Sequence, residues 1–96
     1  MQQLFKLGQI VISSSIGLML KDKDSELYGI DLTELLYRHQ CGDDGDVCKE
    51  DRASNQFAID QGTLRIFSVY KYKTVTVWVI TEHDRSYTTV LLPEDY

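Results

Sequence analysis

The sequence has little of what an exported, membrane-bound or disulfide-stapled chain needs. It contains one proline and two cysteines, and its apolar runs are short, because three serines separate residues 10–12 from residues 16–20. No run approaches the roughly 20 apolar residues of a membrane span. Residues 1–8 carry a single lysine and Gln9 interrupts the apolar character, which disfavours a signal peptide. We therefore expect a cytoplasmic protein that is neither exported nor membrane-anchored.

The chain also lacks a basic cluster. It has 10 Lys and Arg residues against 15 Asp and Glu residues, a formal net charge of −5, and the nearest approach to a cluster is Lys71 and Lys73 at an expected hairpin. Such a chain has no long-range attraction for phosphate backbones. Nucleic acid is therefore disfavoured as a partner, and a protein with a basic surface is favoured. The sequence leaves open whether the chain forms a homodimer.

Catalytic signatures are missing as well. The sequence contains no G-x-S-x-G, no glycine-rich phosphate loop and no H-E-x-x-H pattern. The spacing of Cys41 and Cys48 lacks the second ligand pair that a zinc site needs, and neither His39 nor His83 supplies one. We expect two free thiols rather than a disulfide, no metal, no cofactor and no enzymatic activity.

What is present is an ordinary globular composition, with 43% hydrophobic and 26% charged residues over 96 positions. The length suits one hydrophobic core, so we expect a single domain over residues 1–96. The pattern predicts an α+β fold with an N-terminal strand, two to three helices and then a three-stranded antiparallel meander. The expected elements are a strand over 7–13, helices over 14–20, about 32–39 and about 47–61, and strands over 64–72, 74–81 and 87–92.

Capping residues support the helix predictions. Asp31 stands at the N-cap of the second helix, with Glu34 three residues later as in a capping box. Asp46 is expected to cap the third helix, and Gly62 stands where a left-handed C-terminal cap ends a helix. Within the meander, the middle strand has apolar side chains on both faces, which predicts a central strand covered by helices on at least one side.

The acidic segment 42–51 is the first candidate site. Clustered carboxylates are what calcium or magnesium binds, but an EF-hand reading fails because Lys49 falls where the glycine belongs and Asn55 where the glutamate belongs. The favoured interpretation is a glycine–aspartate turn followed by acidic residues at the positive end of a helix. The carboxylates of this segment remain candidates for a protein interface: Asp43, Asp44, Asp46, Glu50 and Asp51.

The second candidate is the polar connection over residues 81–86. Glu82, Asp84 and Arg85 form the kind of inventory that acid–base chemistry uses. A polar turn is favoured, with Asp84 binding the backbone and Arg85 pairing with Glu82 or Asp84. These three residues complete the set of interface candidates.

Aromatic residues gather in the expected sheet. Trp78 is predicted to lie in the core, and Tyr70, Tyr72 and Tyr87 along strand edges with solvated hydroxyls. Base stacking or a protein interface is the alternative use of such rings.

The Gly–Asp repeat of residues 42–46 is followed by Glu50, Asp51 and Asn55, and then by residues 78–82, 84–86 and 88–96. This combination resembles a family of small bacterial proteins labelled plasmid-related. The resemblance spans nearly the whole chain, and its specific part is the C-terminal stretch over residues 78–82 and 84–96, preceded by the Gly–Asp repeat of residues 42–46. In that family a tryptophan typically stands where this chain has Asp44. Membership would imply a home on a mobile genetic element such as a plasmid or phage, and it implies no particular activity.

These observations predict a small acidic noncatalytic protein of a mobile element that acts by binding another protein. One such role is inhibition of host defence, as an anti-CRISPR protein does. The alternatives are a small nuclease similar to RelE and ParE toxins, with Arg65, Lys71 and Arg85 as its cations, and a hydrolase that uses a divalent metal at segment 42–51. The acidic composition argues against RNA as a substrate.

Overall fold

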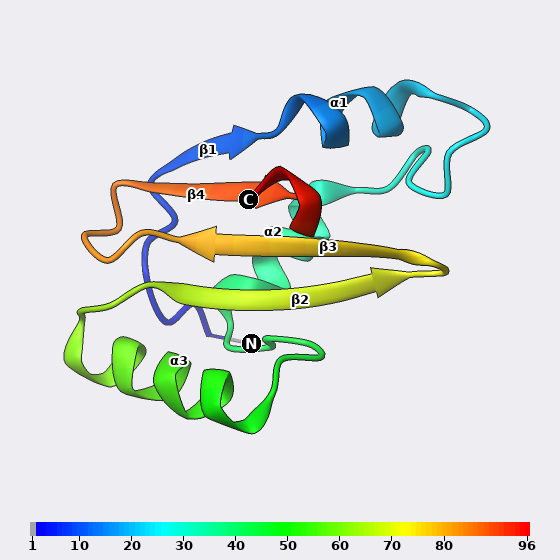
Figure 1. The fold of residues 1–96 in the computed structure, drawn as a ribbon. Coiled ribbons are helices and arrows are strands. Elements are labelled where there is room, and N and C mark those ends of the chain that lie inside the picture. The colour runs from blue at the N-terminus through cyan, green and yellow to red at the C-terminus, as the bar shows by residue number, and fades with distance from the viewer. Residues whose placement is uncertain (1) are drawn as a thin grey trace.

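Four strands form one mixed sheet in the order β1-β4-β3-β2 (Figure 1). The computed structural model describes residues 2–96. Strands β2, β3 and β4 are antiparallel to one another, and β1 runs parallel to β4 at the other edge. The elements are β1 (Gln9–Ile12), α1 (Ser14–Lys21), α2 (Leu32–Gln40), α3 (Lys49–Gln61), β2 (Ile66–Tyr72), β3 (Val75–Thr81), β4 (Tyr87–Leu91) and the 3₁₀ turn η1 (Pro93–Asp95).

The α+β class, the N-terminal strand, the three helices and the antiparallel meander are confirmed. The sheet as a whole differs from a pure meander, because β1 adds to it in parallel. Gly8 makes this addition feasible. Its φ is +67°, and a Cβ there would lie 2.4 Å from the carbonyl oxygens of Arg85 and Ser86. The backbone before β1 therefore passes directly against the β3–β4 turn, where only glycine fits.

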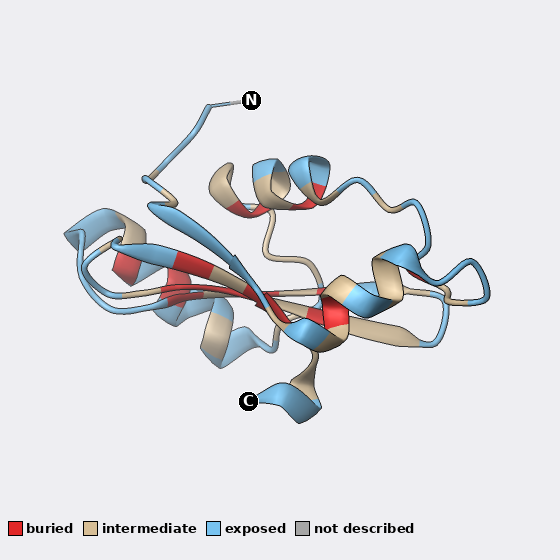
Figure 2. Ribbon diagram, turned by 90° about the horizontal axis from the view of Figure 1, so that it is seen from above, coloured by how far each residue is buried: buried red, intermediate tan, exposed pale blue. Residues whose placement is uncertain are grey.

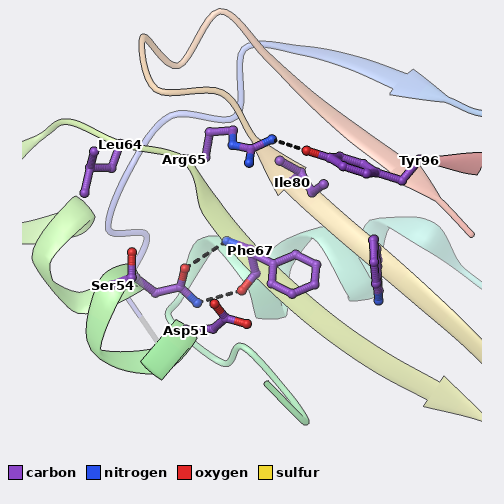
Figure 3. Close-up of a pocket in the computed structure, with 9 residues that line it drawn as sticks. Asp51, Ser54, Leu64, Arg65, Phe67, Ile80 and Tyr96 are labelled. Carbon is purple, nitrogen blue, oxygen red and sulfur yellow. Dashed lines mark hydrogen bonds between the residues drawn. The ribbon is translucent and has the colours of Figure 1, made fainter. Parts of the chain in front are cut away.

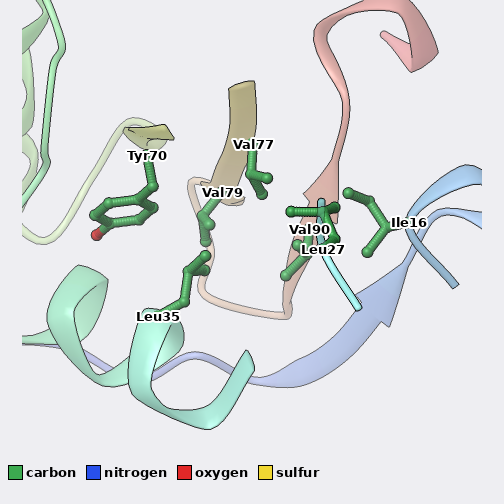
Figure 4. Packing of buried hydrophobic residues seen from close by; sticks show 7 residues of the cluster. All are labelled: Ile16, Leu27, Leu35, Tyr70, Val77, Val79 and Val90. Atoms are coloured by element: carbon green, nitrogen blue, oxygen red, sulfur yellow. The ribbon is translucent and has the colours of Figure 1, made fainter. Parts of the chain in front are cut away.

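One face of the sheet carries the core. Figure 2 shows α2 on one side of the sheet and the C-terminal turn on the other. The α2 side holds a cluster of fully or almost fully buried side chains drawn in Figure 4. Helix α1, the connection after it and α2 supply one layer, and alternate residues of β2, β3 and β4 supply the other. The cluster consists of Ile16, Leu27, Leu35, Tyr70, Val77, Val79 and Val90.

Tyr70 belongs to this core, so the prediction of a solvated strand-edge tyrosine is wrong for it. Its side chain is 2% exposed and its hydroxyl donates to the Asp43 carbonyl. Burial raises its pKa. The error arose because alternation along β2 places residue 70 with Ile66 on the covered face, and the phenol needs a partner only at its tip.

A polar chain crosses the same face beside His39. The Thr88 hydroxyl donates to the Leu7 carbonyl over 2.7 Å, so its oxygen accepts from Thr81. The Thr81 oxygen then accepts from His39 Nε2–H at 2.8 Å, and His39 Nδ1 accepts from Ser68 at 2.6 Å. Burial lowers the pKa of His39 to about 3. The neutral imidazole is therefore a structural group with both nitrogens satisfied.

The helix ends follow the capping predictions with one exception. The Asp31 side chain accepts from the Thr33 N–H at 2.9 Å, and Gly62 ends α3 with a φ of +69°. The exception is α3, whose N-cap is Cys48 and makes no side-chain cap bond. Asp46 does not cap α3, because its own N–H donates to the Val69 carbonyl and keeps the loop beside β2. The helix begins only at Lys49, with Cys48 at the N-cap.

The longest helix, α3, has 13 residues. No helix within residues 2–96 combines the length and the apolar character that a membrane crossing requires.

Candidate functional site

Two of the acidic candidates, Asp43 and Asp44, are used inside the fold. The Asp43 carboxylate accepts from Arg38 Nε at 2.7 Å, and this hydrogen bond lowers the pKa of the carboxyl. Asp44 accepts from Arg52 Nε at 3.1 Å and from the Asn55 amide at 3.2 Å. Both carboxylates therefore have a cation partner within the fold, and their role in a protein interface stays a prediction.

The other three carboxylates of the segment face outward. Asp46 and Glu50 are exposed and Asp51 is half-buried. None of the three forms an ion pair with any of residues 2–96. Glu50 and Asp51 lie in the first turn of α3, where the helix dipole favours negative charge. These side chains therefore form an uncompensated acidic rim, which consists of Asp46, Glu50 and Asp51.

The polar turn at residues 82–86 is confirmed for Asp84 and corrected for Arg85. Asp84 accepts from the N–H and the hydroxyl of Ser86, as expected of an aspartate turn. Arg85 pairs with neither predicted carboxylate. Its guanidinium instead donates to five backbone carbonyls, the shortest at 2.6 Å, which belong to Ala58, Thr63, Leu64, Glu82 and His83. Burial lowers the pKa of Arg85.

The face of the sheet opposite the core carries a pocket of about 340 Å³ between α3 and the C-terminus (Figure 3). Strand alternation places Phe67, Trp78 and Ile80 on this face, and Ile80 is buried there. The volume suits a side chain or a small ligand. The complete lining is Asp51, Ser54, Asn55, Leu64, Arg65, Phe67, Trp78, Ile80 and Tyr96.

Three aromatic rings form the apolar part of the pocket. Phe67 meets Trp78 edge to face with centroids 5.0 Å apart, and Trp78 meets Tyr96 at 5.9 Å and 67°. Trp78 is half-buried, so the prediction that it belongs to the core is wrong. Trp78 lies on the face of β3 opposite Val77 and Val79 of the buried cluster, and its indole lines the pocket.

Helix α3 forms the first wall, and Asn55 fixes it. The Asn55 side chain donates to the Phe67 carbonyl at 2.6 Å and accepts from the Phe67 N–H at 2.9 Å. Asn55 is 5% exposed, and the nitrogen and the oxygen of its side-chain amide both bind the Phe67 backbone. These two backbone groups point away from β3 and would otherwise have no partner at the edge of the sheet. This contact positions Asp51, one turn earlier, at the mouth of the pocket.

The second wall is the connection that carries Leu64 and Arg65. Leu64 adopts a φ of +64°, which is unfavourable for a residue with a branched side chain. The Arg85 guanidinium holds this conformation by binding the carbonyls of Leu64 and its neighbour Thr63. Arg85 is thus a positioning residue for the pocket wall, although its own side chain does not line the pocket.

The C-terminal residue Tyr96 closes one side of the pocket. Asp95, just before it, accepts from the hydroxyls of Ser13 at 2.8 Å and Ser15 at 2.9 Å. Arg65 donates to the Tyr96 hydroxyl at 2.8 Å. These contacts hold a ring that is 70% exposed against Trp78.

The charges around the pocket are acidic on balance. Arg65 is the one cation that lines it, and its pKa is raised first by the Tyr96 hydrogen bond and also by the charge of Glu82. Glu82 therefore offsets Arg65. Asp51 forms no ion pair within residues 2–96, and its carboxylate is hydrogen-bonded to the Cys48 thiol. The pocket thus offers aromatic surface together with an unpaired carboxylate, which is a combination that attracts a cation.

Other chemistry-bearing residues lie outside the lining of this pocket. Ser68 hydrogen-bonds His39 but is 0% exposed, so no substrate reaches its hydroxyl. Cys41 and Cys48 are free thiols, and no cluster of three metal-binding side chains occurs within residues 2–96. The cations of the nuclease alternative are dispersed, since Arg85 is a backbone clamp and Lys71 lies on β2 away from the pocket.

Comparison of the chain with protein-family models, with curated proteins and with solved structures gives no match. The resemblance to plasmid-related proteins stays a prediction, and the functional argument depends on the geometry of the pocket and its acidic rim.

Proposed function

We propose that this protein is a noncatalytic binding module that captures a basic segment of another protein on the open face of its sheet. The observation that supports this most strongly is that three aromatic rings line the same pocket as the Asp51 carboxylate, which forms no ion pair within residues 2–96. A Lys or Arg side chain gains cation–π contact with Trp78 and Tyr96 and an ion pair with Asp51.

The acidic rim extends this complementarity beyond one side chain. Asp46, Glu50 and Asp51 lie on consecutive parts of the loop and of the first turn of α3. A segment with further basic residues would pass over them on leaving the pocket. Electrostatic complementarity of this kind accelerates association and selects against acidic partners. The net charge of −5 acts in the same direction at long range.

The proposal revises which carboxylates bind. Asp43, Asp44 and Asp46 are equal candidates by sequence, but the first two form ion pairs with Arg38 and Arg52. The narrower role, inhibition of a host defence complex on behalf of a mobile element, rests on the sequence resemblance and belongs to the same proposal.

The test is affinity capture from cells of the native host with matched variants. Asp51→Asn and Tyr96→Ala remove one recognition element each, and Asp60→Asn and Tyr28→Ala make the same chemical changes at exposed positions away from the pocket. We expect one stoichiometric protein partner that is retained by the two controls and lost by the two pocket variants. A partner captured equally by all five proteins, or no partner with well-folded bait, would contradict the proposal.

A further inference from the structure

The two edges of the sheet are treated differently. At the β2 edge, the outward backbone groups of Phe67 are bonded by Asn55, and those of Val69 are bonded by the loop, since its N–H donates to Asp44 at 3.0 Å and its carbonyl accepts from Asp46 at 2.9 Å. Gly45 permits this approach, because a Cβ there would lie 2.0 Å from the Val69 oxygen. The loop and α3 thus cover this edge at Phe67 and Val69, which hinders pairing with another strand there.

The β1 edge is open. The N–H groups of Gln9 and Ser13 donate to Ser86 and Val90 at the β4 side. Since alternate residues of a strand direct their backbone groups to opposite sides, those of Ile10 and Ile12 point outward, and no hydrogen bond within residues 2–96 reaches them. Their side chains and that of Val11 are 39%, 43% and 41% exposed, respectively.

The devices that usually protect an edge are absent here. Residues 7–20 contain no charged side chain and no proline, and they form the longest uncharged stretch of a chain in which 26% of residues are charged. A second copy could therefore pair with this edge without bringing like charges face to face. Elsewhere on a protein with net charge −5, contact between two copies tends to oppose acidic side chains.

We propose that β1 is a homodimer interface, formed by antiparallel pairing of β1 with β1 of a second copy. In the register centred on Val11, Ile10 of each copy faces Ile12 of the other. Their outward N–H and C=O groups then form hydrogen-bonded pairs, and the two Val11 side chains meet at the closer, non-hydrogen-bonded position. Because each copy uses the same strand about a two-fold axis, the pairing is isologous and stops at two copies.

The experiment is sedimentation equilibrium of the whole chain over a concentration series. Val11→Lys places two like charges opposite each other at the centre of the interface, and Phe57→Lys introduces the same charge at a site on α3 that is 54% exposed. Ile10→Pro removes one outward N–H while leaving the β1–β4 bonds intact, because that N–H takes no part in them. Circular dichroism and thermal unfolding check that each variant is folded.

We expect a monomer–dimer equilibrium that Phe57→Lys leaves unchanged and that Val11→Lys weakens by about tenfold or more. Ile10→Pro, as a folded protein, should weaken it similarly. A monomer at every concentration, or a dimer that both Val11→Lys and Ile10→Pro leave unchanged, would overturn the proposal.

Discussion

The two faces of the sheet use similar residues for opposite purposes. On the α2 face, Leu35, Val77 and Val79 are at most 1% exposed, and even the polar His39 has both ring nitrogens satisfied. On the other face, Phe67 and Trp78 are half-buried, and Tyr96 covers them with a ring that is mostly solvated. The first face carries the main buried cluster, while the second buries Ile80 and Leu91 beside its rings. The second is a rigid aromatic surface that the fold does not need to cover.

The largest expected contrast in stability is between a leucine of the core and a leucine of the pocket wall. Leu35→Ala creates a cavity in the core and should lower the free energy of unfolding by about 2–5 kcal/mol. Leu64→Ala at the pocket wall, where the side chain is 47% exposed, should cost less than about 1 kcal/mol. Denaturant unfolding of both variants measures the difference. Equal losses would show that the two faces contribute alike.

The second contrast concerns Arg85, which connects the two walls of the pocket. Arg85→Ala removes the charged donor that joins the carbonyls of Ala58, Thr63 and Leu64 to the β3–β4 turn, and it should cost about 1.5–3 kcal/mol of unfolding free energy. Lys71→Ala removes an exposed cation that no carbonyl binds, and should change stability by less than about 0.5 kcal/mol. The fluorescence of Trp78, the single tryptophan, should also shift in Arg85→Ala. An unchanged spectrum would contradict its role as a positioning residue.

The third contrast is the pH dependence of the free energy of unfolding, which we expect from His39 on the covered face. Because the folded-state pKa of His39 is about 3, the unfolded chain binds a proton below pH 6.5 that the folded chain does not bind. Stability contributed by His39 is therefore complete above pH 6.5 and falls as the pH drops, by about 1.4 kcal/mol per unit. Urea unfolding between pH 6.5 and 5 measures the slope above the carboxyl range, and His39→Gln should abolish it.

The smallest effect on stability is expected at Tyr96. Tyr96→Ala should change the free energy of unfolding by less than about 0.5 kcal/mol, because the ring is 70% exposed. Thermal unfolding measures this change. A loss comparable to that of Leu35→Ala would mean that the C-terminal turn is part of the core rather than a wall of the binding surface.

Local signals were sufficient for most of the fold. The N-cap at Asp31, the left-handed Gly62 and the alternation along the three C-terminal strands each act within a few residues, and their elements were predicted within two residues at most ends. The parallel addition of β1 depends on an approach between residue 8 and residues 85–86, which no local pattern encodes.

The pocket was harder to predict for the same physical reason. The five carbonyls that Arg85 binds come from three separate segments, so its charge pointed wrongly towards nearby carboxylates. Tyr96 reaches Trp78 only because Asp95 binds two serines some 80 residues earlier in the chain. One signal was available. Apolar residues on both faces of β3, in a chain with few helices to cover them, indicated that one face would be open.

The most direct test of the central claim follows the Trp78 indole N–H by nuclear magnetic resonance during titration with short peptides. One peptide carries a central arginine, and its control carries the uncharged norleucine at that position. We expect the arginine peptide to shift the indole resonance, the norleucine peptide to leave it in place, and Asp51→Asn to remove most of the response while Asp60→Asn preserves it. An equal response to both peptides, or none to either, would contradict a pocket that selects a basic side chain.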